Sequence, residues 1–225
     1  MFAIDHAATA LLIKRRFPKL PIWVMLISVQ LMEFVWVALN LLGVERTTTE
    51  PKVTSVSDIH LSYMPYSHSV ATMLGVSVAA WILLAVVLRQ RELGLAVAIG
   101  IGSHLVLDLI THARDIPLAP GVEQVHLGIG FYSNFPVVAF MLELGYGVLC
   151  WWVYKGGKRL LAIIILFNVA NLSFFFGGVP GPEALLANRP GLTASLILVQ
   201  IVVTLVLVGS FSMKPKPPYL QSERA

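Results

Sequence analysis

Histidine and aspartate recur at a four-residue spacing in one apolar stretch of the chain, His104-x-x-x-Asp108-x-x-x-His112. In a helix, each four-residue step advances about 40° beyond a full turn, so the three side chains form one stripe. Imidazole and carboxylate groups on adjacent turns can bind one divalent metal ion. Because His104 and His112 would lie about 12 Å apart along the axis, a neighbouring pair with ligands from other helices is the simpler site. His112 would then orient a ligand or lie in the headgroup region.

Other polar side chains interrupt apolar stretches elsewhere in the chain. An ionisable side chain at the centre of a bilayer costs about 2.5 kcal/mol or more, so each one needs a partner. One such residue alone is typical of a structural hydrogen bond between helices, but their number favours a shared polar cavity. The set outside the stripe comprises Asp5, His6, Gln30, Glu33, Ser67, His68, Ser69, Glu143, Asn168 and Asn171.

The composition predicts that membrane-spanning helices position these residues. Of the 225 residues, 57% are apolar and only 12% are charged, whereas an ordinary soluble domain carries about 25% charged residues. The single cysteine, Cys150, excludes an intramolecular disulfide. A helix needs about 20 apolar residues to cross a bilayer, and six stretches approach that length: 20–43, 66–88, 93–112, 133–154, 158–176 and 191–213.

The basic residues indicate the orientation of these spans. Twelve of the 16 Lys and Arg residues precede the first span, join spans two and three or four and five, or follow the last span. The positive-inside rule therefore places both termini in the cytoplasm. The net charge of +4 follows from this topology and does not indicate nucleic-acid binding.

Residues 1–13 are apolar but too short to span a bilayer. Two structures are open to them: an amphipathic helix at the cytoplasmic interface, or a half-helix inserted into the bundle. We therefore expect an all-α integral membrane protein with a bundle of about six transmembrane helices plus this N-terminal helix. The transmembrane domain would cover residues 1–213, and residues 214–225 would form a cytoplasmic tail.

Three features resemble the bacterial LexA-regulated, membrane-bound metal-dependent hydrolase-like family. They are the N-terminal His6, the triplet Ser67-His68-Ser69 and the run from His104 to Thr111, which is similar to the family's His-Leu-x-Leu-Asp-x-x-Thr element. The resemblance covers residues 1–115. Where family members carry Pro-Asp-x-Asp-His, this chain has residues 30–34, Gln-Leu-Met-Glu-Phe, so only one carboxylate remains.

The resemblance implies a bacterial inner-membrane hydrolase with a divalent metal ion, for which zinc is the candidate. The ligands would be His6, His68, His104 and Asp108, together with Glu33. The general base would be Glu33, if it is not a ligand, or Glu143. The side chains around the ligands would be Asp5, Gln30, His112 and Asn168.

The expected substrate is a lipid or a lipid-linked (phospho)ester that enters the cavity from the membrane. Two alternatives stay open. Carboxylates near the midplane are also used in ion or proton-coupled transport, and the chain could be a non-catalytic accessory or assembly subunit whose polar residues bind neighbouring helices.

Overall fold

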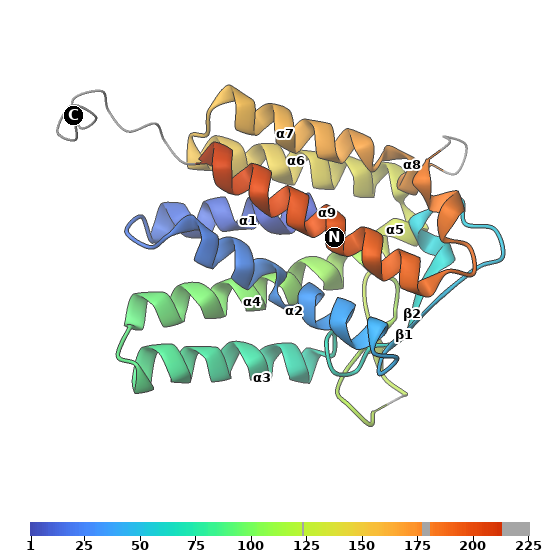
Figure 1. The fold of residues 1–225 in the computed structure, drawn as a ribbon, viewed down its shortest axis with the longest axis horizontal. Helices are drawn as coiled ribbons and strands as arrows, with labels where there is room; N and C mark the ends of the chain where they lie inside the picture. Colours follow the sequence, from blue (N-terminus) through green and yellow to red (C-terminus); the bar gives the residue numbers. More distant parts are fainter. Residues whose placement is uncertain (123, 177–180, 213–225) are drawn as a thin grey trace.

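The computed structural model of the chain describes residues 1–122, 124–176 and 181–212. Its helices run side by side in one bundle, with short turns at one end and longer loops at the other (Figure 1). The predicted tail, residues 214–225, lies outside the described residues.

Five helices of the described residues are long and apolar enough to cross a membrane. Their mean hydropathy lies between 1.6 and 2.5, and this apolarity explains why they form transmembrane rather than surface helices. The all-α membrane fold is thereby confirmed. The five are α2 (Ile22–Leu41), α3 (Val70–Trp81) extended by the π-helical η2 (Ile82–Val87), α4 (Arg91–Thr111), α6 (Pro136–Tyr154) and α9 (Pro190–Ser212).

The stretch predicted as the fifth span is interrupted. It forms α7 (Lys158–Ala170) and the short α8 (Leu172–Phe175), separated by Asn171. The 13 residues of α7 extend about 20 Å, less than the roughly 30 Å of the hydrocarbon core. Asparagine side chains compete for backbone hydrogen bonds and favour helix ends. Of the six spans predicted from the sequence, the described residues thus form five helices long enough to cross a membrane and one helix that is interrupted.

The N-terminal segment forms α1 (Ala3–Arg16), a half-helix inside the bundle. Nearly every residue from Ala3 to Ile13 is buried, whereas an interfacial helix would expose one whole face. The helix contacts α2, α4, α6, α7 and α9. Met1 therefore lies within the bundle, and the basic end of α1, with Lys14, Arg15 and Arg16, lies at the same end as the α3–α4 and α6–α7 turns (Figure 1).

Small residues let the helices that carry the polar side chains approach closely. Gly100 of α4 faces Ser28 of α2, and a methyl group at position 100 would overlap the Ser28 side chain. Gly147 of α6 leaves room for the carboxylate of Asp5 in α1. Close contact of this kind is typical of small residues in membrane helices.

The longer loops lie at the end opposite the basic turns (Figure 1). β1 (Arg46–Thr49) pairs antiparallel with β2 (Ile59–Tyr63), and the 3-10 helix η1 (Val56–Asp58) precedes β2. The remaining short elements are β3 (Ile116–Pro117), paired with β4 (His126–Leu127), then α5 (Phe131–Asn134) and η3 (Pro182–Leu186).

Asp58 organises the first of these loops. Its Oδ2 accepts hydrogen bonds from the Thr54 amide at 2.7 Å, the Thr54 hydroxyl at 2.8 Å and the Ser55 amide at 3.0 Å. Partial burial raises the pKa of Asp58, but these hydrogen bonds outweigh it and hold the pKa below its ordinary value.

Candidate metal centre

Four side chains from three parts of the chain meet inside the bundle. Glu33 comes from α2, His68 from the turn before α3, and both His104 and Asp108 from α4. Each offers one ligand atom, and all four atoms lie within 4.8 Å of one another. His104 and Asp108, two members of the stripe at four-residue spacing, thus meet candidate ligands from α2 and from the turn before α3.

The distances between the ligand atoms fit a single ion. Glu33 Oε1 lies 3.6 Å from His68 Nε2 and 3.7 Å from His104 Nε2. Asp108 Oδ2 lies 3.8 Å from His68 Nε2 and 3.0 Å from His104 Nε2. Ligands about 2.0–2.2 Å from a tetrahedral zinc ion stand about 3.3–3.6 Å apart. One of the four observed distances lies at the upper end of that range, and the other three lie within about 0.3 Å of it.

Hydrogen bonding at His104 leaves a lone pair directed at this group. Its Nδ1 lies 2.7 Å from the carbonyl oxygen of Val29, which only accepts, so Nδ1 carries the proton and donates it. His104 Nε2 and Asp108 Oδ2 are buried, and neither has a hydrogen-bond partner among the described residues. In a neutral imidazole, Nε2 then carries a lone pair that faces Asp108 Oδ2 at 3.0 Å, and the two groups repel unless a cation lies between them. The donor set therefore fits a divalent metal ion.

A relay through Ser67 orients His68. The Ser67 hydroxyl donates to Glu45 Oε2 at 2.5 Å, so its oxygen accepts from His68 Nδ1 at 2.8 Å. Glu45 is buried and also accepts from the Tyr66 and Ser67 amides. His68 Nε2 is thereby left free to face the ligand group. The sequence gives no signal for Glu45, because its partner lies 22 residues away in another element.

His6 lies beside the group, not within it. Its ring stacks on His104 with centroids 3.9 Å apart, and its Nε2 lies 3.2 Å from Asp108 Oδ1. The Met1 amino group donates to the same oxygen at 2.7 Å and to Thr111 at 2.9 Å. These contacts occupy Oδ1 and leave Asp108 Oδ2 to face the centre. His6, predicted as a ligand, thus contacts Asp108 Oδ1 from outside the four-atom group.

His112 lies at the margin of the group. Its Nε2 is 3.9 Å from Asp108 Oδ1, and its Nδ1 is 3.4 Å from Asp115. This position agrees with the predicted place of His112 around the ligands rather than among them.

The other predicted residues, Glu143, Gln30, Asn168 and Asp5, are not among the four residues of the ligand group. Glu143 Oε1 accepts from the Tyr132 hydroxyl and, at 3.4 Å, from the Phe2 amide. Gln30 donates to the Ala3 carbonyl at 2.8 Å, and Asn168 donates within α7 to Ile164 at 3.0 Å. The remaining one, Asp5, is buried, with no hydrogen-bond partner for either carboxylate oxygen among the described residues.

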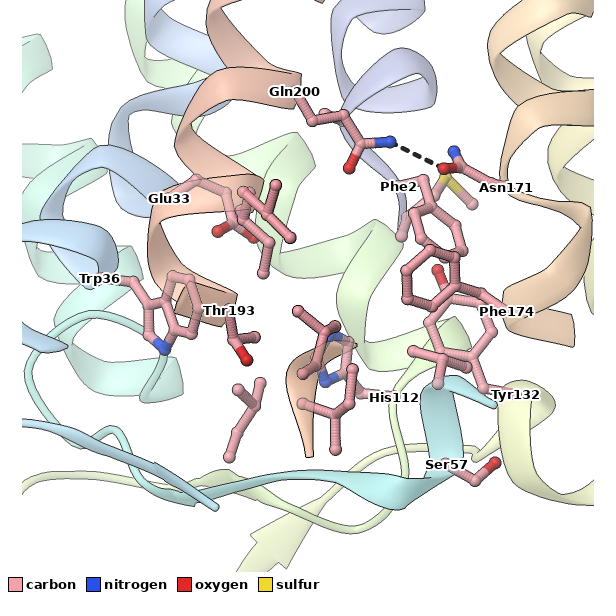
Figure 2. Close-up of a pocket in the computed structure, with 18 of the residues that line it drawn as sticks. Phe2, Glu33, Trp36, Ser57, His112, Tyr132, Asn171, Phe174, Thr193 and Gln200 are labelled. Carbon is pink, nitrogen blue, oxygen red and sulfur yellow. Dashed lines mark hydrogen bonds between the residues drawn. The ribbon is translucent and has the colours of Figure 1, made fainter. Parts of the chain in front are cut away.

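A cavity of about 700 Å³ adjoins the ligand group. Glu33 and His68 line it, so two of the four candidate ligands reach its wall. Figure 2 shows the cavity between the side that carries Glu33 and Trp36 and the side that carries Asn171 and Phe174. The volume is within the range of about 300–1,000 Å³ that is usual for small-molecule sites.

Comparison with known proteins identifies the family. A family model described as YdjM inner membrane protein matches residues 54–179. The match contains the Ser67-His68-Ser69 triplet and the run from His104 to Thr111, and it continues beyond the residues 1–115 of the resemblance, but residues 1–53, with His6 and Glu33, lie outside it. Searches of curated proteins and of solved structures gave no match. Because the match covers more than half of the 225 residues, the chain belongs to the YdjM inner membrane protein family and is a multi-pass protein of the inner membrane.

Proposed function

We propose that the protein is a membrane-embedded, metal-dependent hydrolase that acts on a lipid or a lipid-linked (phospho)ester. One observation carries the proposal: the ligand atoms of Glu33, His68, His104 and Asp108 converge beside a cavity large enough for a small molecule. Metal ligands that lie next to a cavity favour catalysis, because a purely structural site is enclosed by its ligands.

The burial of the four side chains suggests a division of roles. The side chains of His68, His104 and Asp108 are almost fully buried, whereas that of Glu33 is 17% exposed. We assign the three buried residues as the ligands of the ion, which leaves a coordination position open as in catalytic zinc sites. When bound, a divalent ion polarises the scissile carbonyl or phosphoryl group and makes water a better nucleophile at neutral pH.

Glu33 is placed to act as the general base. Its Oε1 lies 3.6–3.7 Å from the two imidazole nitrogens that face the centre, and its side chain lines the cavity. A carboxylate there can accept the proton of the attacking water. Glu143 is less suited to this role, because it is not among the residues that line the cavity.

The membrane-facing side of the cavity supports a lipid substrate. Leu196, Val199 and Val203 of α9 line the cavity, and more than a third of each residue is exposed. Their apolar side chains would contact lipid chains at this position. A substrate with an acyl or prenyl chain can therefore reach the cavity without leaving the bilayer.

The first test is the metal content of protein purified without chelators. We expect about one divalent ion per chain in the wild type, measured by elemental mass spectrometry, and none in His104→Ala or Asp108→Asn. The matched control is His60→Ala, because His60 is exposed, forms an ion pair with Glu50 at 3.0 Å and does not belong to the four-residue ligand group. Wild-type protein without a stoichiometric metal ion would refute the proposal.

Glu33→Gln tests the assignment of the base. We expect this variant to keep its metal ion and to lose the release of fatty acid or phosphate from inner-membrane lipid extract. Loss of the metal ion in Glu33→Gln would instead make Glu33 a ligand and overturn its role as the base.

A further inference from the structure

We propose that Asn171 and Gln200 form a second subsite of the cavity, which binds an uncharged hydrogen-bonding group of a lipid, such as a hydroxyl or an ester carbonyl. The inference deepens the proposed function, because it names the class of molecule that reaches the metal centre. It depends on the contacts of two amide side chains that the proposed chemistry does not use.

The two amides join the broken helix to α9 across the cavity wall. Gln200 Nε2 donates to Asn171 Oδ1 at 2.8 Å, and both residues line the cavity (Figure 2). Asn171 is 4% exposed, and its Nδ2 has no hydrogen-bond partner among the described residues. A buried amide with an unused donor costs about 1–3 kcal/mol. Nδ2 is covered in this structure, so the amide must turn toward the cavity before a ligand can accept this hydrogen bond and remove the cost.

The surroundings of the pair favour an uncharged ligand group. The cavity lining contributed by the described residues of α7, α8 and α9 contains no charged side chain; beside the two amides it includes Phe167, Ala170, Phe174, Ile197 and Ile201. The cations that line the cavity belong to other elements: the Met1 amino group, which is paired with Asp108, and Arg114. A phosphate or carboxylate at the two amides would have no cation on α7, α8 or α9, and burying an unpaired charge is expensive. An amide pair satisfies a hydroxyl or a carbonyl without such a charge.

The lipid chain has a route next to this pair. Val199 and Val203 are neighbours of Gln200 on α9, line the cavity and are 58% and 42% exposed. We infer that the chain passes between α7 and α9 while the polar junction of the lipid contacts Asn171 and Gln200. The reactive bond then lies deeper in the cavity, toward Glu33 and His68.

The test measures binding of 1-O-oleylglycerol, a neutral lipid whose ether bond resists hydrolysis, to detergent-purified protein by native mass spectrometry. We expect wild-type protein to bind one molecule, and Asn171→Leu and Gln200→Met to bind it about tenfold more weakly, the loss expected for one or two hydrogen bonds. Thr204→Val is the matched control: Thr204 is buried on the same helix, its hydroxyl has no partner among the described residues, and it does not line the cavity.

A second pair of variants leaves the amides intact. Val199→Trp places bulk at the membrane-facing side of the cavity and should abolish binding. Val202→Trp makes the same change at an exposed α9 residue outside the lining and should not. Equal binding of the probe by wild type, Asn171→Leu and Gln200→Met overturns the subsite. Oleate has the same chain with an anionic head, and oleate that binds as tightly as the neutral probe also overturns the subsite.

Metal content, measured on the same samples, separates this proposal from the hydrolase. Wild-type metal in Asn171→Leu, together with weaker lipid binding, supports the subsite. If no protein sample contains metal but binding still depends on Asn171, the hydrolase is refuted and the subsite stands.

Discussion

A methyl group added at Gly100 should disturb the metal centre without changing any ligand. Gly100 lies one turn before His104 in α4 and faces Ser28 of α2. The residue after Ser28 is Val29, whose carbonyl accepts the hydrogen bond that orients His104. Gly100→Ala therefore acts on the helix contact that sets the position of this imidazole.

The structure gives the size of the disturbance. A Cβ atom at position 100 would overlap the Ser28 hydroxyl and would lie 2.8 Å from Ser28 Cβ. Carbon atoms in contact prefer about 3.5–4.0 Å, so the helices must separate locally by about 0.7 Å or more. Overpacking of this kind lowers the free energy of unfolding by about 1–3 kcal/mol. Metal–ligand distances stay within about 0.2 Å of their usual values. Disturbing a partner that orients a ligand weakens metal affinity about 10–100-fold.

The assay compares thermal unfolding and metal affinity in Gly100→Ala and Gly102→Ala. Gly102 is on the same helix, but a Cβ atom there would meet only the Ser77 hydroxyl, at an ordinary 3.7 Å. We expect a lower Tm and weaker metal binding in Gly100→Ala alone, with partial recovery when Ser28→Gly is added. Equal Tm and equal metal affinity in the two alanine variants would refute the argument that this contact positions His104.

Three further predictions follow from the contacts around the site. Ser67→Ala removes the acceptor of His68 Nδ1 and should weaken metal affinity about 10–100-fold. The control Ser69→Ala removes the N-cap of α3 and should lower the free energy of unfolding by about 1 kcal/mol with unchanged metal affinity. An equal effect of both variants on metal binding contradicts the relay. Glu143→Gln should leave proton permeability of proteoliposomes unchanged, and a wild-type proton flux that this variant abolishes would favour transport over hydrolysis. Because the pKa of Asp58 is lowered in the folded protein, its stabilisation of the loop is present above the ordinary pKa and is lost as the pH falls through the lowered value. The protection factors of the amides of residues 54–58, which are exchange rates corrected for the intrinsic pH dependence, should therefore fall with acid in the wild type. An equal fall in Asp58→Asn would show that this carboxylate is not the cause.

Hydropathy predicts the spans well because the cost of burying polar groups in lipid depends on composition and length. It could not show that Asn171 interrupts residues 158–176, because that stretch remains apolar on average. The position of α1 was also undetermined, because an interfacial helix and a buried half-helix require similar short apolar segments. Its burial depends on contacts with five other helices, which no local pattern encodes.

The four-residue spacing predicted that His104 and Asp108 share a site, because this proximity follows from helix geometry alone. The approach of Glu33 and His68 depends on how α2 and the turn before α3 pack against α4, for which the family motif was the only guide. His6 has its predicted neighbours, but the geometry places it on Asp108 Oδ1, not in the ligand group. The motifs therefore predicted which residues would lie near one another, and tertiary packing decided which of their atoms face one another.

The charge balance of the site explains why these roles matter for the fold. Buried carboxylates are costly unless cations or hydrogen-bond donors surround them. Asp108 Oδ1 has such partners in the Met1 amino group and His6. Asp108 Oδ2 and Glu33 Oε1 face imidazole nitrogens instead, and the nitrogen of a neutral His104 presents a lone pair there, because its one proton is donated to Val29. The chain thus neutralises Asp108 Oδ1 and leaves Oδ2 among four ligand atoms that could hold a metal ion.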